Sequence, residues 1–293
     1  MVAVERHDVE VPGGELACFR FGDPNAECVA VAAHGITSNA FAWLAVARAL
    51  GGRVALLAPD LRGRGRSSGL PGRYGIEAHV RDVLAVLDAL GADRAVQAGH
   101  SLGAYIVAAG AAAFPDRVGA VVLVDGGLPI PGSENIDLDE FLGPALGRLT
   151  LRFADREEYR QWWRAHPAFR GGDFTEADLD AYADHDLVGA GSELRSSVVE
   201  AAVRADAAGL VETADAAYRL DVPAWLLCAP RGLVDDSNPM QPILIAEEWA
   251  GADRRRSAVL VPDANHYTLV FGARGAAAVA DAIAAACDAS SVH

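Results

Sequence analysis

The hydrophobic pattern of the chain consists of short apolar runs that alternate with longer amphipathic stretches. The runs are rich in Val, Leu and Ala and occupy residues 28–33, 54–59, 94–99, 118–124, 224–229 and 258–261. Runs that stay apolar without alternation are typical of strands covered on both faces. Their alternation with helical stretches predicts an α/β fold with a mostly parallel central sheet flanked by helices.

The stretches between the runs have helical periodicity. Residues 77–90 place Val80 and Leu87 on one face, as expected of a helix that packs on a sheet. Asp82 and Asp88 belong to the same stretch, and we expect both to face water.

The two ends of the chain add a hairpin and a helix. Extended segments flank Gly13 and Gly14, which predicts a β-hairpin that leads into the main sheet. Residues 276–287 are rich in Ala and predict the final helix.

The middle of the chain departs from the alternation. Between the runs that end at Val124 and begin at Ala224 lie roughly a hundred residues, far more than the 2 to 6 of an ordinary αβ loop. Helical patterns occur there at residues 137–149, 156–165 and 194–205. We therefore predict a core domain of residues 1–130 and 220–293, interrupted by a helical cap at residues 131–219.

Composition narrows the classes of partner. The chain has 52% hydrophobic and 22% charged residues, with 25 Lys and Arg against 40 Asp and Glu and a net charge of −15. A strongly negative charge opposes attraction to nucleic-acid phosphates and to anionic lipid. We expect a soluble protein without a nucleic-acid or membrane partner, and the pattern leaves open whether copies of it form a homo-oligomer.

The cysteines and the N-terminus bear on the compartment. Cys18, Cys28, Cys228 and Cys287 are scattered without CxxC spacing, so we expect neither a zinc site nor a disulfide framework. The first 14 residues lack the basic start and apolar stretch of a secretory signal. These features predict a cytoplasmic protein.

The strongest chemical signal is a Gly-x-Ser-x-Gly motif. Residues 99–103 read Gly-His-Ser-Leu-Gly, after a predicted strand and before a helical stretch. In that context Ser101 is held on a sharp strand-to-helix turn, which is typical of a nucleophile. The backbone N–H of Leu102, at the start of the helix, is a candidate donor to an oxyanion.

A serine nucleophile needs a base within hydrogen-bond reach, usually histidine. His266 follows the last predicted strand, where a loop at the carboxyl edge of the sheet would bring it over Ser101. His34 and His100 stand next to motif glycines, and we expect them to orient backbone or pocket instead. His266 is therefore the predicted base.

The motifs together resemble the α/β-hydrolase family. They are His-Gly at residues 34–35, Asp-Leu-Arg-Gly-Arg-Gly-Arg-Ser at 60–67, the serine motif at 99–103 and Asn-His at 265–266, in the family's order. The resemblance covers nearly the whole chain except the predicted cap. It implies that the backbone N–H of Ile36 is the second oxyanion donor and that Gly35 lines the substrate site.

Two positions remain open for the acid that orients the histidine. Asp125 ends the run at 118–124, whereas Asp235 and Asp236 follow the run at 224–229. The order Ser, Asp, His admits both positions. Asp235 departs from the Gly-x-x-Asp spacing that is common in the family, so we favour Asp125, whose alternative role is to cap the adjacent turn.

These residues predict an acyl-transfer mechanism that requires no metal or organic cofactor. The adjacent Trp162 and Trp163 in the predicted cap are candidates for substrate contact, with one of the two facing inward. The expected substrate is a small to medium, apolar or aromatic ester or lactone. The cap and the early acid are similar to those of lactone hydrolases, including enzymes that act on zearalenone.

Two other functions fit the same pattern. A hydrolase of this fold that cleaves a carbon–carbon bond would use the same three residues. A non-catalytic ligand-binding protein could keep the fold, although an intact Ser101 and His266 pair counts against it.

Overall fold

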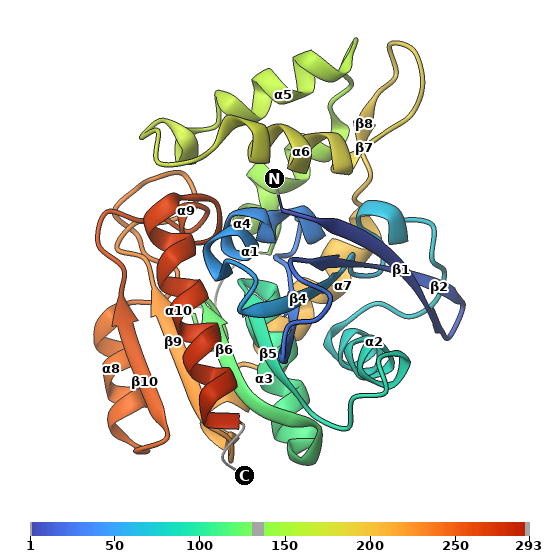
Figure 1. Cartoon of the computed structure of the whole chain (residues 1–293). Helices are drawn as coiled ribbons and strands as arrows, with labels where there is room; N and C mark the ends of the chain where they lie inside the picture. The colour runs from blue at the N-terminus through green and yellow to red at the C-terminus, as the bar shows by residue number, and fades with distance from the viewer. Residues whose placement is uncertain (1, 131–137, 291–293) are drawn as a thin grey trace.

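An eight-stranded sheet runs through the computed structural model, which describes residues 2–130 and 138–290 (Figure 1). In the order in which they neighbour one another, its strands are β1 (Val4–Val11), β2 (Gly14–Phe21), β4 (Val54–Pro59), β3 (Cys28–Ala33), β5 (Ala95–His100), β6 (Val118–Val124), β9 (Ala224–Cys228) and β10 (Arg256–Leu260). The β1–β2 and β2–β4 pairs are antiparallel and the others are parallel. The predicted α/β fold with a mostly parallel sheet is confirmed.

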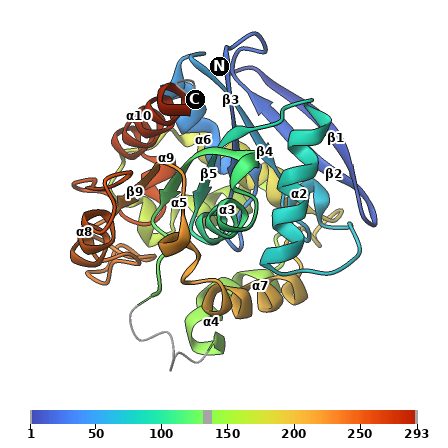
Figure 2. The ribbon, with the colours of Figure 1, turned by 90° about the horizontal axis from the view of Figure 1, so that it is seen from below.

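Helices cover both faces of the sheet (Figure 2). One face carries α1 (Leu44–Leu50) and α10 (Ala273–Ser290), and the other carries α2 (Ile76–Ala89), α3 (Leu102–Ala113) and α8 (Ile243–Gly251). In β6, Val122 and Val124 pack with the α10 side, while Val121 and Leu123 pack with the α3 side. Neighbouring side chains of a strand point to opposite helical layers, and both layers are apolar. The runs are therefore apolar at every position.

Helix α2 buries one carboxylate that was expected to face water. Asp82 is buried and accepts two hydrogen bonds from Arg62, at 2.5 and 2.7 Å, whereas Asp88 is exposed as predicted. The prediction for Asp82 was wrong because the helical pattern does not reveal its partner. Arg62 lies in the loop after β4 and reaches Asp82 only in the folded chain. A bidentate guanidinium compensates the charge that burial would otherwise penalise.

The segment between β6 and β9 forms elements of its own. They are α4 (Leu138–Thr150), α5 (Arg156–Arg164), α6 (Glu176–Asp186), a small sheet of β7 (Leu187–Val188) and β8 (Arg195–Ser196), and α7 (Glu200–Glu212). Helices α5 and α6 pair above the loops that follow β3 and β4 (Figure 1), and α7 packs beside α2 and α3. We refer to residues 138–219 as the insertion.

The insertion departs from the sequence patterns at several points. The helix expected at 194–205 starts only at Glu200, because residues 195–196 pair with β7. Helix α6 was not anticipated. Pro131 and Asp137, where the cap and its first helix were expected to start, lie outside the described residues, so the limits of the cap stay a prediction.

A disulfide contradicts the expectation from cysteine spacing. Cys28, at the start of β3, is bonded to Cys287, in α10, across 259 residues of sequence. Spacing could not reveal this pair, because only the packing of α10 on the sheet brings the two residues together. Cys18 and Cys228 are buried free thiols, and burial raises the pKa of each to about 12.

The cytoplasmic location stays a prediction. Among the described residues, no helix is both long and apolar enough to cross a membrane. Disulfides persist mainly in oxidising compartments, so the Cys28–Cys287 bond weighs against a reducing cytoplasm.

We expect the double variant Cys28→Ser, Cys287→Ser to lose about 2–4 kcal/mol of unfolding free energy, because its unfolded chain is no longer cross-linked. Urea denaturation without reductant measures the change. Reductant should destabilise the wild type by a similar amount and leave the double variant unaffected. Alkylation of all four cysteines in unfolded, unreduced wild type would contradict the disulfide.

Candidate active site

Ser101 stands on a sharp turn between β5 and α3. Its φ of 55° and ψ of −121° form a conformation that residues with side chains rarely adopt. A Cβ atom at Gly99 would lie 2.1 Å from the carbonyl oxygen of Gly103, and one at Gly103 would lie 2.0 Å from that of Ala33. The two motif glycines are therefore required by the close approach of backbone to backbone around Ser101.

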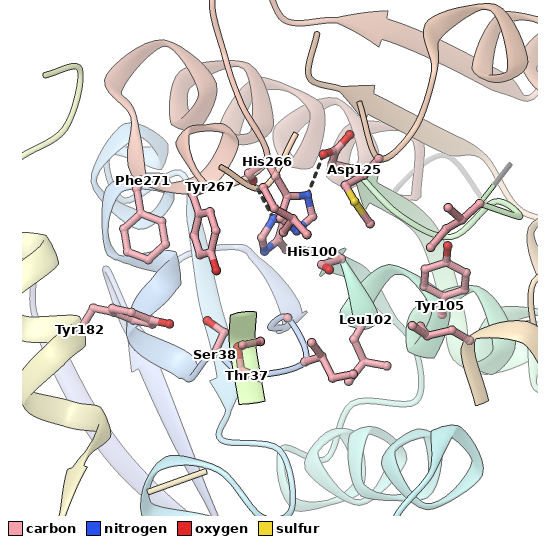
Figure 3. A pocket seen from close by; sticks show the side chains of 18 residues that line it. Thr37, Ser38, His100, Leu102, Tyr105, Asp125, Tyr182, His266, Tyr267 and Phe271 are labelled. Atoms are coloured by element: carbon pink, nitrogen blue, oxygen red, sulfur yellow. Dashed lines mark hydrogen bonds and ion pairs between the residues drawn. The ribbon is translucent and has the colours of Figure 1, made fainter. Parts of the chain in front are cut away.

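His266 and Asp125 form a buried hydrogen bond. His266 lies in the loop between β10 and α9 (Thr268–Phe271), and its Nδ1 atom is 2.7 Å from Oδ2 of Asp125 (Figure 3). With an ionised carboxylate as acceptor, Nδ1 carries the proton and Nε2 keeps its lone pair. This is the tautomer that a general base requires.

The neighbouring strand fixes the carboxylate of Asp125. The Asp125 amide donates to the carbonyl oxygen of Leu227 at 2.8 Å, and its Oδ1 accepts from the amide of Ala229 at 3.3 Å. Because β9 lies next to β6 in the sheet, the acid is oriented by the sheet itself.

The other two candidate acids have different partners. Asp235 pairs with Arg231 at 3.0 Å and accepts from Nδ2 of Asn265 at 2.9 Å, while Asp236 accepts from the amide of Asn238 at 2.8 Å. The structure thus brings Asp125 to His266. Asp235 instead supports the residue that precedes His266.

The loop after β3 presents its amides from a fixed backbone. The carbonyl of Gly35 accepts from the Ser38 amide at 3.1 Å and from Nδ1 of His34 at 2.8 Å. The Leu61 amide donates to Nε2 of His34 at 3.0 Å, which leaves the proton on Nδ1. In a trans peptide the next N–H points away from the carbonyl, so the Ile36 amide is directed away from these anchors.

Two buried arginines hold the next two carbonyls of this loop. Arg64 donates through Nε to the carbonyl oxygen of Ile36 at 2.9 Å, and Arg148, from α4, donates to that of Thr37 at 2.7 Å. Each guanidinium is paired with an acid of the insertion, Asp206 at 2.6 Å and Asp186 at 2.6 Å. Buried charges of this kind need such partners, so the loop and the insertion are linked electrostatically.

His100 contacts the histidine loop from the side of the serine motif. Its Nε2 donates to the backbone oxygen of His266 at 2.9 Å, and the two rings lie 4.6 Å apart. Burial and the neighbouring His266 hold the pKa of His100 well below its ordinary value. A neutral His100 therefore orients the loop without adding a second charge beside His266.

A cavity of about 80 Å³ unites most of the predicted site residues. It is lined by Gly35, Ile36, Ser101, Leu102, Asp125 and His266. Further lining residues are Tyr182, one of the aromatic residues of the predicted cap, and others that the sequence did not indicate, among them Ser38, Tyr105, Leu233, Met240, Tyr267 and Phe271. These additions come from five separate segments, and no short motif marks them. Among the described residues, no cluster of three or more His, Cys, Asp or Glu could hold a metal ion.

The structure does not bring Trp162 or Trp163 to this cavity. Trp163 is buried beneath the Arg148 guanidinium, which lies 5.1 Å from its ring centre, and Trp162 packs against Trp163 at 5.0 Å. Tyr182, from α6, lines the cavity where a tryptophan of α5 was expected. Of the three aromatic residues of α5, Tyr159 and Trp163 are buried in the insertion, and Trp162 is half-buried against Trp163.

Sequence comparison gives partial matches to characterised proteins. The chain is 35% identical over 141 residues to the lipase LipV of Mycobacterium tuberculosis, covering 46% of this chain and 53% of LipV. It is 37% identical over 116 residues to epoxide hydrolase A of the same species, covering 39% of this chain and 36% of that enzyme. The chain thus spans about half or less of the length of these relatives.

Structural comparison extends over the whole fold. The crystal structure of E-2-(acetamidomethylene)succinate hydrolase matches with a TM-score of 0.78 at 20% identity, covering 98% of this chain and 100% of that chain. A thioesterase domain from the curacin biosynthetic pathway matches with a TM-score of 0.74 at 22% identity, covering 96% and 99%. At these identities the likeness concerns the fold alone.

A family model supplies the assignment. The model described as alpha/beta hydrolase fold matches residues 31–188, which is more than half of the chain. The matched region includes the loop after β3, the serine motif and Asp125. The chain therefore belongs to the α/β-hydrolase fold family.

Proposed function

We propose that the chain is a serine hydrolase that cleaves a carboxylic ester or lactone through an acyl-enzyme on Ser101. The observation that carries the proposal is the buried 2.7 Å hydrogen bond between His266 and Asp125, in the same cavity as the strained Ser101 turn. This combination supplies a nucleophile, a base and an orienting acid.

The proposed reaction has two halves. Nε2 of His266 removes the Ser101 proton as Oγ attacks the acyl carbon, and the N–H groups of Ile36 and Leu102 hold the oxyanion. Collapse breaks the bond to the alcohol, which leaves with the proton from His266. Water, activated by the same histidine, then attacks the acyl-enzyme and releases the carboxylic acid and Ser101.

Cavity size bears on the substrate. Sites for drug-sized ligands have volumes of roughly 300–1,000 Å³, whereas this cavity measures about 80 Å³. A small acyl group fits this volume better than a macrocyclic lactone of the zearalenone type. We therefore favour small esters, and a carbon–carbon bond hydrolase acting on a small diketone remains the second candidate because it uses the same three residues.

Hydrolysis through an alkyl-ester intermediate and ligand binding without catalysis have less support. Hydrolases that form an alkyl-ester intermediate need a carboxylate nucleophile, and this chain has Ser101 in the motif. The likeness to epoxide hydrolase A therefore does not extend to that chemistry in our proposal. A non-catalytic binding protein would have no need of the His266–Asp125 pair. We propose that the chain acts without nucleic-acid or membrane partners, alone or as a homo-oligomer.

We expect Ser101→Ala to lower kcat on short p-nitrophenyl esters by at least about 10⁴-fold, because the nucleophile is lost. Initial-rate assays on p-nitrophenyl esters from acetate to octanoate measure this loss of kcat. The same measurement on a diketone substrate ranks the two substrate classes. A serine-directed phosphonate should increase the mass of the wild type by one phosphonyl group and leave the mass of the variant unchanged. Undiminished turnover by Ser101→Ala would refute the mechanism.

The acid is tested by a matched pair of variants. Asp125→Asn should lower kcat by about 10⁴-fold, because the amide favours the wrong histidine tautomer. Asp235→Asn should have a far smaller effect, since the Asp235 carboxylate contacts Asn265 and Arg231, and His266 is not among its partners in the described part of the chain. Measurement of kcat for both variants on one ester decides which carboxylate is the acid. Equal losses would contradict the assignment of Asp125.

Arg148→Lys should reduce kcat by about 10- to 100-fold with little change in KM. A lysine ammonium keeps the charge beside Asp186 but cannot also reach the Thr37 carbonyl, and a charged hydrogen bond contributes about 1.5–3 kcal/mol. Arg160→Lys is the control, because Arg160 pairs with Asp184 on the outside of the insertion.

The affinity of a boronic-acid inhibitor, which mimics the tetrahedral intermediate, should fall in parallel with kcat in Arg148→Lys. Loss of kcat without loss of inhibitor affinity, or the same loss in Arg160→Lys, would show that Arg148 does not act through the loop after β3.

A further inference from the structure

We propose that Ser38, Tyr182 and Tyr267 form a subsite that binds an uncharged oxygen of the substrate, a hydroxyl or a carbonyl, away from the scissile bond. The proposal rests on the hydrolase function proposed above and names its substrate class. The three residues come from the loop after β3, from α6 and from the loop that carries His266. All three line the cavity.

The hydroxyl groups of these residues converge at one end of the cavity (Figure 3). In Figure 3 the hydroxyls of Ser38 and Tyr182 point toward one another, and the Tyr267 hydroxyl lies beside them. Both rings are fixed: Tyr182 packs on Phe271 at 5.0 Å and Tyr267 packs on His266 at 5.8 Å. The convergence is therefore built into the fold.

The Tyr267 hydroxyl has no hydrogen-bond partner among the described residues of the protein. Hydroxyl groups that leave water without a new partner cost free energy. A substrate oxygen placed between Tyr267 and the Ser38–Tyr182 pair would supply that partner. A substrate that lacks the oxygen would leave the group unpaired, which is the condition under which polar sites discriminate well.

A third tyrosine of the same cavity provides the contrast. Tyr105 lies at the other end (Figure 3), and its hydroxyl donates to the backbone oxygen of Leu128 at 2.7 Å. The rest of the lining is largely aliphatic and includes Ile36, Leu102, Ile130, Leu210, Leu233 and Met240. Apart from the residues proposed for catalysis, the hydroxyls of the cavity therefore gather at one end, and Tyr105 does not contribute to it.

Charge decides the class of oxygen. The described lining contains no Lys or Arg side chain, so a carboxylate would lose its hydration without gaining a counter-ion. Arg148 lies behind the tyrosines, but Asp186 neutralises it at 2.6 Å. A neutral hydroxyl or carbonyl oxygen can accept a hydrogen bond from the Tyr267 hydroxyl without this cost.

The test uses substrates that differ only in the distal oxygen. p-Nitrophenyl 4-oxopentanoate against p-nitrophenyl pentanoate probes the acyl side, and 4-hydroxybutyl acetate against pentyl acetate probes the alcohol side. We expect the wild type to prefer the oxygenated member of one pair by about 5- to 10-fold in kcat/KM, the effect of a hydrogen bond of about 1 kcal/mol. The hemiglutarate p-nitrophenyl ester, which bears a carboxylate, should be the poorest acyl substrate.

Tyr267→Phe and Tyr182→Phe should each bring the ratio within the preferred pair close to one, while Tyr105→Phe should keep the wild-type ratio. The ratio is measured within each variant, so a change in the amount of folded enzyme does not affect it. Equal ratios in all four proteins would overturn the subsite, and preference for the carboxylate ester would overturn its neutral character. Turnover by Ser101→Ala would instead refute the proposed hydrolase function.

Discussion

The buried guanidinium of Arg148 connects the insertion to the loop that carries Ile36. Arg148 is 3% exposed, and it donates to Asp186 on one side and to the Thr37 carbonyl on the other. Removal of one partner would leave a buried charge or carbonyl uncompensated, at a cost of several kcal/mol. The conformation of the loop after β3 therefore depends on the folded insertion as well as on the sheet.

Arg64 also joins a carbonyl of this loop to an acid of the insertion, in this case on α7. It holds the Ile36 carbonyl and pairs with Asp206 of α7, whose pKa stays below its ordinary value because Arg64 and His79 outweigh the burial that would raise it. Buried ion pairs contribute little net stability compared with apolar contacts, and their best-attested role is to specify one arrangement. Two such pairs on successive carbonyls give the loop a single backbone conformation before any ligand binds.

The features that sequence predicted are those that depend on neighbours along the chain. The strands and the Ser101 turn follow from continuous apolar runs and from glycines beside the serine. The choice between Asp125 and Asp235 could not be made in the same way, since β6 and β9 are adjacent and both end at the same edge. The Cys28–Cys287 bond and the burial of Asp82 also depend on partners that only tertiary packing supplies.

Trp163 shows how a residue can govern the cavity without lining it. Its ring lies under Arg148 at 5.1 Å and contacts the rings of Tyr182 at 5.1 Å and Tyr267 at 6.2 Å. One side chain thus supports both the cation that holds the loop after β3 and two tyrosines that line the cavity. Because protein interiors are close-packed, a shift of this ring moves both. In the enzyme that we propose, substrate selection by these tyrosines and the geometry of the loop after β3 therefore cannot be altered independently through Trp163. Enlargement of the cavity at that end would disturb the backbone beside Ser101.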